Sequence, residues 1–471
     1  MAIDGKCPDP PAAGAIDCSL EASRKEGSVA QVALTILDYY VIPFALFLGA
    51  SSREIGLLTA LPNLLASFSQ FFVVDVLRAA GNRRRLLIWS VAAQSFALAP
   101  MCALPFIDGV KSIDLLLACL SLFRVVGAVM GPPWGSLMSD YLPENKRGDY
   151  FGRRSQLVGV SGMLVAVVCG CMLSAIHARK AGAIPFFLLF AAATFCRGWS
   201  TRYMAAMTDM PLHPQAPPRP AEDGRSFWRR LHESNFARFV AYAAAITFAA
   251  QMTAAYLSVH MLRDLHYSYF WYTAVQLSSA VASFLTFPIW GRHADHVGNA
   301  RVLRLNSVLL PVIPLLWCMT EAPWGLALIE AFGGFVWAGF NLCSTNFIYE
   351  AVPPEQRVRA LGYFNLLNGA AIFCGATLGG YLADALPPVW GYSIHTLFLI
   401  AAGVRFAADF LLAYHFREVR PTAKRVTGEA LFFSVIGVRP LIGHNVDLEF
   451  DAPARLSRHG EPRVGPLAPR A

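Results

Sequence analysis

Residues 290–301 read Trp-Gly-Arg-His-Ala-Asp-His-Val-Gly-Asn-Ala-Arg, a charged stretch with two glycines between two long apolar runs. One run ends near residue 289 and the other begins near residue 302. Glycine suits positions where the backbone needs a positive φ or where two helix ends come close. Asp295 is placed to accept hydrogen bonds from backbone amides or from the flanking basic residues. The stretch therefore predicts a tight polar turn between two apolar helices.

Apolar runs of this kind recur along nearly the whole chain. The 471 residues are 55% hydrophobic and 15% charged, whereas soluble domains carry about 25% charged residues. A helix needs about 20 mostly apolar residues to cross a bilayer, and these runs are continuous instead of alternating as barrel strands would be. The chain is therefore predicted to be an all-α polytopic membrane protein with twelve transmembrane helices in two six-helix halves. The predicted spans are 29–49, 54–75, 84–107, 113–139, 155–177, 182–206, 236–261, 268–291, 301–320, 323–349, 359–382 and 390–416.

The formal charge of +8 is distributed unevenly between the loops. Basic residues gather in one set of alternate loops, which holds Arg78, Arg83, Arg84, Arg85, Lys146, Arg147, Arg153, Arg154, Arg225, Arg229, Arg230, Arg292, Arg301, Arg304, Arg357 and Arg359. The other set holds little beyond Arg53, Lys111, Arg179, Lys180 and Arg263. This asymmetry follows the positive-inside rule and predicts that both termini are cytoplasmic. The charge therefore reflects topology and contact with anionic lipids, and we expect no nucleic-acid partner.

Three segments lie outside the predicted helical bundles of residues 28–206 and 236–416. Residues 1–27 are charged, lack the short apolar core of a secretory signal, and are expected to form a cytoplasmic tail. Residues 207–235 form a linker in which 226–233 have the composition of an interfacial helix, with a solvated linker as the alternative. Residues 417–471 form a second cytoplasmic tail, whose apolar part, 430–438, is too short to span.

The two halves repeat one another in sequence. Asp140 and Glu350 are each followed at the same spacing by a proline and then an arginine, at Arg147 and Arg357. Internal repeats with six spans per half are typical of transporters that bind substrate between the repeats, near the bilayer midplane. The sequence therefore predicts two pseudo-symmetric halves.

The polar turn carries a pattern, Gly291-x-x-x-Asp295-His296-x-Gly298-x-x-Arg301, that resembles the signature loop of the major facilitator superfamily. Residues 124–127, Arg-Val-Val-Gly, are similar to the fourth-helix motif of that superfamily, and 150–154 resemble a sequence common in its bacterial members. The resemblance covers about residues 28–416. It implies a twelve-helix secondary transporter of the cell (inner) membrane that works by alternating access.

Two departures qualify the resemblance. The first-half counterpart of the signature loop has Arg78 where the superfamily normally has Asp, with Asp75 one turn earlier. The fifth span, 157–173, lacks the Gly-Pro pair of drug/proton antiporters, which counts against drug export. We expect the gating elements to include Gly291, Asp295, Gly298, Arg301, Asp140 and Glu350.

Ionisable residues inside a bilayer cost several kcal/mol each and therefore mark candidate sites. Asp38, Arg124 and Glu330 fall within the first, fourth and tenth spans, which the resemblance places around a central cavity together with the seventh. Asp38 and Arg124 are compatible with a substrate clamp, a proton relay or a static buried pair. Further residues that either contact substrate or pack helices are Gln251, Tyr39, Trp134, Trp337 and Asn341.

Arg405 and Asp409 stand one helical turn apart in the twelfth span, the spacing of an intrahelical ion pair. Because the resemblance makes this helix peripheral, a structural role is favoured for both. His293 and His296 have the spacing of a metal pair but occupy the basic positions of the signature loop, so no metal site is expected.

The chain has no glycine loop beside a lysine that would cradle phosphates and no set of nucleophile and base. We therefore expect neither enzymatic activity nor a cofactor. The predicted function is secondary active transport of a small polar or charged solute by a monomer, with a proton as candidate coupling ion. The alternative is a non-transporting assembly factor, chaperone or receptor on the same fold, which a sealed or apolar cavity would favour.

Overall fold

The computed structural model describes residues 13–107, 110–177, 182–210, 234–353 and 356–419, and three positions further on, 431, 434 and 435. Twelve helices that are long and apolar enough to cross a membrane lie in this part of the chain. The prediction of an all-α membrane protein with twelve spans is confirmed. The predicted interfacial helix at 226–233 and most of the C-terminal tail fall outside the described residues.

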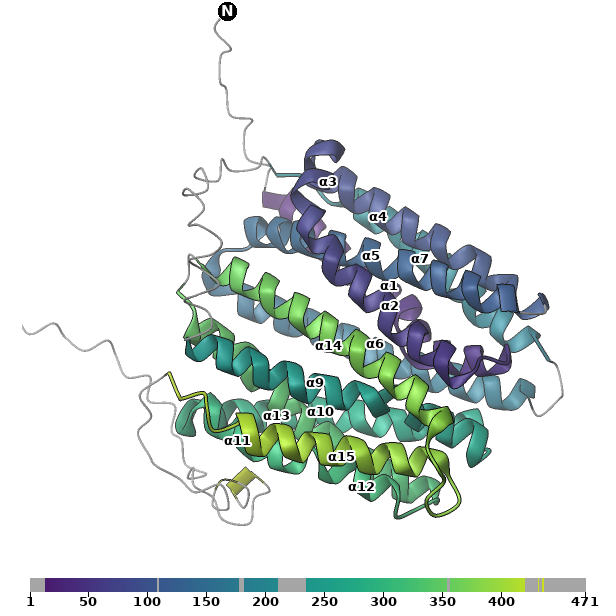
Figure 1. Cartoon of the computed structure of the whole chain (residues 1–471). Helices are drawn as coiled ribbons and strands as arrows, with labels where there is room; N and C mark the ends of the chain where they lie inside the picture. The colour runs from purple at the N-terminus through teal and green to yellow at the C-terminus, as the bar shows by residue number, and fades with distance from the viewer. Residues whose placement is uncertain are drawn as a thin grey trace, which may run out of the picture. The chain divides into compact units, whose positions relative to one another are not determined.

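The first six spans form the N-terminal half, drawn in purple to blue in Figure 1. They are α1 (Ala13–Phe47), α2 (Ser52–Ser69) continued by α3 (Val73–Ala80), α4 (Arg83–Leu98), α5 (Val110–Tyr141), α6 (Glu144–His177) and α7 (Ile184–Ala206). The last six spans form the C-terminal half, drawn in teal to yellow-green. They are α9 (Asn235–Val259), α10 (Tyr269–Val297), α11 (Asn299–Leu309) continued by α12 (Val312–Trp317), α13 (Pro323–Ala351), α14 (Arg357–Ala385) and α15 (Ser393–Leu412).

Local sequence fixes where these helices begin and end. Ser51 and Glu54 form a capping box at the start of α2, in which each side chain accepts from the backbone N–H of the other residue. Glycine ends α3 and α10, because Gly81 has φ +84° and Gly298 has φ +94°, and L side chains rarely adopt such angles. These two turns occupy equivalent places in the two halves.

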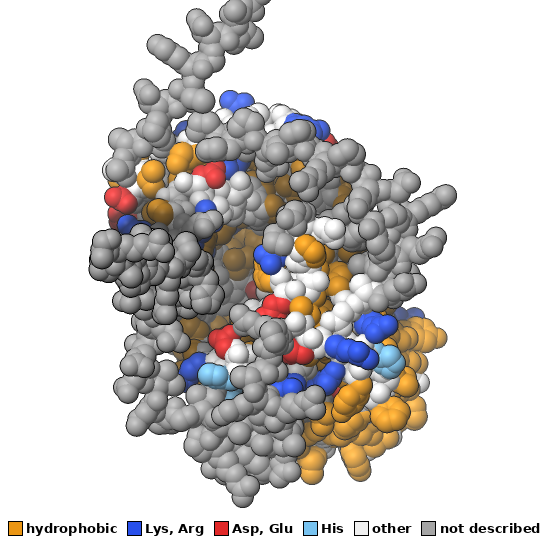
Figure 2. All heavy atoms as spheres, turned by 90° about the vertical axis from the view of Figure 1, so that its left-hand side faces the viewer, with side chains coloured by type: hydrophobic (Ala, Val, Ile, Leu, Met, Phe, Trp, Pro, Cys, Tyr) orange, Lys and Arg blue, Asp and Glu red, His pale blue; other side chains and the backbone are white. Residues whose placement is uncertain are grey.

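The bundle has two ends that differ in charge. We call the end that holds the turns at Gly81 and Gly298 the basic end, and the end that holds the turns at Gly49 and Trp390 the far end. The basic end lies at the left of Figure 1. Figure 2 looks onto it and shows Lys, Arg, Asp and Glu side chains, with hydrophobic side chains set deeper between them.

The two halves meet along a seam in which α2 packs on α14 and α6 packs on α10. Towards the far end, the seam brings backbones into close contact at Gly56, where an added Cβ would lie 2.6 Å from the carbonyl oxygen of Ala376. The hydrogen bonds that cross this region include Tyr256 Oη to Ser52 O (3.2 Å), Arg263 Nη1 to Ser52 Oγ (3.2 Å), Tyr272 Oη to Tyr39 O (2.7 Å) and Tyr40 Oη with Thr273 Oγ1 (2.9 Å). The seam is therefore tightly closed near the far end.

Helix α1 begins at Ala13, inside the segment 1–27 that was predicted to be a tail. Its first turns are held by packing and hydrogen bonds that a sequence of mixed charge does not reveal. Ser19 Oγ accepts from the backbone N–H of Thr208 (3.0 Å), and Glu26 is buried against Arg197. The helix therefore extends well before the predicted boundary at residue 27.

The stretch that predicted a polar turn is mostly helical. Helix α10 continues to Val297, so that Gly291 lies within the helix and only Gly298 turns the chain. Trp290 explains the extension, because its buried indole packs on Phe335 and its Nε1–H donates to the carbonyl of that residue (2.8 Å). The predicted turn is therefore real but shorter than expected.

Candidate functional site

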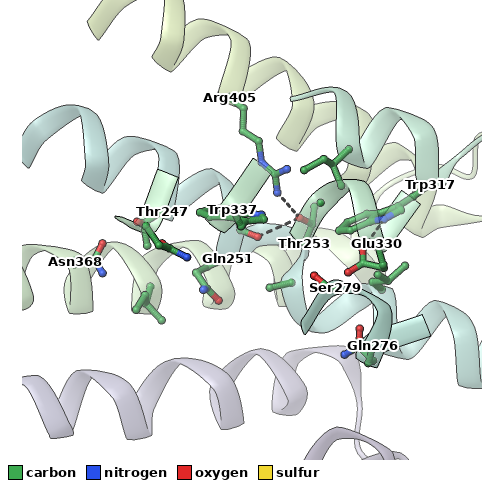
Figure 3. A pocket seen from close by; sticks show the side chains of 17 residues that line it. Thr247, Gln251, Thr253, Gln276, Ser279, Trp317, Glu330, Trp337, Asn368 and Arg405 are labelled. Atoms are coloured by element: carbon green, nitrogen blue, oxygen red, sulfur yellow. Dashed lines mark hydrogen bonds between the residues drawn. The ribbon is translucent and has the colours of Figure 1, made fainter. Parts of the chain in front are cut away.

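A polar cavity of about 420 Å³ lies among the helices of the C-terminal half (Figure 3). Four residues predicted as site candidates line it together: Gln251, Glu330, Trp337 and Asn341. They come from α9 and α13, the seventh and tenth spans, as the resemblance implies. The volume falls within the range of small-molecule sites, which is roughly 300–1,000 Å³.

Glu330 and Arg405 are the charged groups in the wall of this cavity. Glu330 is buried and accepts a hydrogen bond from Trp317 Nε1 (2.9 Å). Arg405 is also buried and donates to Leu310 O (3.0 Å) and to Thr253 Oγ1 (2.9 Å). The opposite formal charges balance, so this cavity carries no net charge.

The predicted ion pair between Arg405 and Asp409 is wrong. Asp409 instead accepts a hydrogen bond from Ser307 on α11. The guanidinium of Arg405 points into the C-terminal half (Figure 3), where a backbone carbonyl accepts from Nη1 and a hydroxyl accepts from Nη2, while the buried Nε finds no acceptor among the described residues. Sequence spacing identifies residues on neighbouring turns, but it does not reveal that better partners lie on other helices. Arg405 therefore belongs to the candidate site.

The remaining polar lining is uncharged. Amide and hydroxyl groups come from α9, α10, α13 and α14, and these residues are Thr247, Gln251, Gln276, Ser279, Asn341 and Asn368. Each of these groups both donates and accepts hydrogen bonds. The cavity can therefore hold an uncharged polar body with hydroxyl, amide or ring-nitrogen groups.

A second cavity, of about 390 Å³, lies in the N-terminal half. Arg124 and Trp134, both predicted candidates, line it. Asp38 pairs with Arg124 at 2.5 Å between Oδ1 and Nη2, so the structure brings these two predicted residues together. Tyr39 lies instead at the seam, where its carbonyl accepts from Tyr272.

The wall of the same cavity also contains a buried network of hydrogen bonds and ion pairs that was not predicted from the sequence. Arg197 on α7 is 3% exposed and donates from Nη1 to Glu26 Oε1 and from Nε to Gln94 Oε1, each at 2.9 Å. Arg154 lies against the other oxygen of Glu26 at 3.6 Å. Arg197 could have been found from the sequence, because it is an arginine inside an apolar run. Glu26 gave no such signal, because it lay in the predicted tail.

The predicted gating acids take part in matching contacts at the basic end. Asp140 pairs with Arg83 at 2.7 Å, and the side chain of Arg83 is 2% exposed. Glu350 accepts from Asn299 Nδ2 at 3.0 Å. Each contact ties the end of the fourth or tenth span to the start of the third or ninth. Asp295 is exposed in the last turn of α10.

The internal repeat is visible in individual hydrogen bonds. Arg147 Nε donates to Leu142 O at 3.1 Å, and Arg357 Nε donates to Val352 O at 3.2 Å. Both arginines reach back five residues to close the same turn, so the shared Pro and Arg spacing corresponds to a shared local structure.

Metal-binding residues do not cluster in the described part of the chain, where no group of three or more His, Cys, Asp and Glu side chains is placed to hold an ion. Nδ1 of His293 lies 2.8 Å from the carbonyl oxygen of Ile289, one turn earlier in α10. This histidine is engaged within its own helix.

A membrane bundle of two repeated six-helix halves, with polar cavities in its interior, has the architecture of secondary transporters. The sequence profile of the Major Facilitator Superfamily matches residues 28–343 and, in a second match, residues 239–447. The chain belongs to the Major Facilitator Superfamily.

Similar curated proteins are named as multidrug transporters, but each match is partial. The multidrug resistance protein MdtG of Dickeya zeae is 30% identical over 142 residues, which cover 30% of this chain and 32% of that protein. The multi-drug resistance efflux pump PmrA of Streptococcus pneumoniae is 29% identical over 161 residues, covering 33% of this chain and 38% of the pump. The chain thus matches about a third of the length of these relatives.

Solved structures share the fold over most of the chain. The nucleoside transporter NupG aligns with a TM-score of 0.64 and 14% identity, covering 86% of this chain and all of NupG (100%). A bacterial homologue of the iron transporter ferroportin, in an inward-facing state, aligns with a TM-score of 0.63 and 11% identity over 86% of this chain and 100% of its own. At these identities the likeness establishes the fold alone.

Proposed function

We propose that this protein is a secondary transporter that moves a small polar solute across the membrane by alternating access. The observation that carries the proposal is the pairing of a polar cavity in each half with a seam that is closed near the far end. When a solute is bound between the two halves, a rocking movement of the halves opens the site first to one side of the membrane and then to the other. Membership of the Major Facilitator Superfamily supports the same conclusion.

The arrangement corresponds to an inward-facing state, with the basic end in the cytoplasm. The positive-inside rule supports this orientation, because arginines such as Arg83, Arg84 and Arg85 gather at the basic end. Tyrosine hydroxyls on the C-terminal half bond to the N-terminal half near the far end, which is then the outer gate. Both termini are cytoplasmic in this orientation, and the membrane is the inner membrane of a bacterial cell.

The polar lining favours transport over a non-transporting role. A protein that binds no solute in this cavity gains nothing from the amides and the two buried charged groups that face it, each of which is costly in a bilayer. The same lining distinguishes the protein from exporters of apolar drugs, because Gln251, Gln276 and Asn368 favour hydrogen-bonding solutes.

Asp38 is the candidate for proton coupling. Its carboxylate meets Arg124 in a half-exposed pair, which a proton or a substrate can break. If Asp38→Asn leaves gradient-driven uptake into proteoliposomes unaltered at every pH, the carboxylate does not couple transport to protons.

Alternating access can be tested before the substrate is known. Nitroxide labels at Phe106 and Met319, both exposed near the far end, report the separation of the halves there, and labels at Arg78 and Tyr414 report it at the basic end. In a variant without native cysteines, we expect double electron–electron resonance to show two populations. The label–label distance at the far end should be longer in the population in which the distance at the basic end is shorter. A single unchanging distance at both ends, in nanodiscs at every pH tested, would exclude a transport cycle.

A further inference from the structure

The charges of the two cavities differ, and this difference identifies the class of solute. The cavity in the N-terminal half is lined by three arginines and one glutamate, which are Arg124, Arg154, Arg197 and Glu26. The cavity in the C-terminal half is lined by one arginine and one glutamate, and its formal charges cancel. Any charge selectivity therefore has to come from the N-terminal half.

One of the three arginines is fully occupied. Arg197 and Glu26 are both buried and lie 2.9 Å apart, Gln94 accepts a further hydrogen bond from Arg197, and Ser200 donates to Glu26. A buried ion pair whose two members both have hydrogen-bond partners holds helices together. Removing either member leaves the other as an uncompensated buried charge. Arg197 therefore neutralises the charge of Glu26.

Arg154 therefore lacks a carboxylate of its own. Its Nη2 lies 3.6 Å from Glu26, which is already bonded to Arg197, and its Nε donates to the backbone carbonyl of Ser23 at 3.3 Å. Its guanidinium carbon stands 4.5 Å from the centre of the Trp134 ring, a cation–π contact that helps to orient it but does not neutralise it. Two guanidinium groups here share one carboxylate.

Arg124 is held on one side only. Among the described residues it donates a hydrogen bond from Nη2 to Asp38, and its side chain is 32% exposed. A guanidinium has five N–H donors in a planar fork that fits a carboxylate or phosphate. Counting Asp38, three guanidiniums face two carboxylates, which leaves one positive charge without a partner.

Trp134 gives independent support for an acceptor in this cavity. Its Nε1–H is buried and finds no acceptor among the described residues. An indole N–H only donates, and buried donors are normally bonded. Because Trp134 lines this cavity, its unpartnered N–H is a candidate donor to a solute bound there.

Resting on the proposed transport function, we propose that the solute is an organic anion. Its carboxylate or phosphate binds between Arg124 and Arg154 in the N-terminal half, and its uncharged polar body faces the amides of the C-terminal half. An anion supplies the charge that the arginines lack and an acceptor for Trp134. A cationic solute would meet an unopposed positive charge and be excluded.

The test uses ligands that share one skeleton and differ in charge. The purified full-length protein is heated at constant ionic strength with glucose, glucosamine, gluconate, glucose 6-phosphate or inorganic phosphate, and the unfolding midpoint is followed as each is titrated. We expect gluconate or the phosphates to raise the midpoint and glucose and glucosamine to leave it unchanged. The gluconate and phosphate arms distinguish a carboxylate site from a phosphate site.

Variants then locate the effect. Arg124→Gln and Arg154→Gln should each weaken the apparent affinity for the stabilising anion about 10- to 100-fold, the range for a lost charged hydrogen bond. Arg124→Lys, which keeps the charge, should lose less, and Arg78→Gln, at an exposed arginine, should match the wild type. Gel filtration and the midpoint without ligand identify any variant that fails to fold.

Three results would overturn the proposal: stabilisation by glucosamine or glucose but not by anions, stabilisation by none of the five compounds, or anion stabilisation that survives in both glutamine variants. The transport function would stand in each case if the two label pairs still report opposite movements. If those labels report one fixed state while anions bind as expected, the site is real and transport is not its purpose.

Discussion

Gly56 offers the sharpest test of the seam, because an added Cβ there would meet a backbone carbonyl of the other half near the far end. A Cβ at this position would lie 2.6 Å from Ala376 O, 2.7 Å from Tyr256 Oη and 3.3 Å from Gly380 Cα. Carbon atoms in ordinary contact are about 3.5–4.0 Å from their neighbours. Gly56→Ala therefore requires α2 and α14 to separate by roughly 0.9 Å or more at this point if the halves are to stay closed.

The cost falls on one state of the cycle only. Overpacking by one methyl group typically costs about 1–3 kcal/mol, and the clash disappears when the seam opens near the far end. Each 1.4 kcal/mol changes an equilibrium tenfold, so the population with the far end open should rise about 5- to 150-fold relative to the closed one. The hydrogen bond from Tyr256 to Ser52 should weaken with it, because the added methyl displaces that hydroxyl.

The assay is the distance between labels at Phe106 and Met319, measured in Gly56→Ala and in Gly135→Ala. Gly135 is also helical, and an added Cβ there meets no heavy atom within 4 Å. Both changes gain the same helix propensity, about 1 kcal/mol, so the difference between them isolates the seam. We expect a longer distance in Gly56→Ala alone. Equal distance distributions in the two variants, with both folded, would refute the view that this contact closes one state.

Three further predictions concern the gating residues and the C-terminal cavity. Asp295→Ala should impair the exchange between states more than Asp75→Ala, because the first-half loop has lost the signature aspartate, and equal effects on the label distances would contradict this. Arg83→Gln should lower the free energy of unfolding by about 1.5–3 kcal/mol, the usual contribution of a hydrogen bond to a charged group, because water reaches Asp140, whose side chain is 29% exposed; a thermal midpoint equal to that of wild type would show that Asp140 needs no partner. Glu330→Gln keeps the acceptor for Trp317 but leaves Arg405 unbalanced, so binding of a neutral solute should weaken and anion binding should strengthen in the thermal-shift titration; unchanged affinities would remove Glu330 from the site.

The transmembrane helices could be predicted from the sequence because their signal is local. A run of about 20 apolar residues has few alternatives in a bilayer, and all twelve spans appear in the structure. Asp38 and Arg124 stood out because isolated charges are costly in lipid, and the family resemblance placed their helices around one cavity, where the structure pairs them. Only the prediction of the helices themselves needs no knowledge of which helix faces which.

The rest of the site depends on tertiary contacts. Glu26 looked like part of a charged tail, and only its burial against Arg197 makes it a wall of the cavity. Arg405 has a carboxylate one turn away in sequence, yet its partners lie on α9 and at the end of α11. Side-chain direction decides both cases, and it is set by packing that one sequence does not display.

The repeat explains how one scaffold provides two different cavities. The spacing of 210 residues that relates Asp140 to Glu350 also holds within the helices α5 and α13. Positions related by this spacing line the cavity in each half, and the matching pairs are Phe123 with Gly333, Gly127 with Trp337, and Gly131 with Asn341. The backbone therefore presents equivalent positions to both cavities, while the side chains differ. Two of these positions on α5 are glycines, and arginines from α5, α6 and α7 line the cavity beside them. On α13 the equivalent positions carry an indole and an amide. Charge recognition in one half and hydrogen-bond recognition in the other can thus arise by substitution on a common frame, which is why we assign the anionic group and the polar body of the solute to different halves.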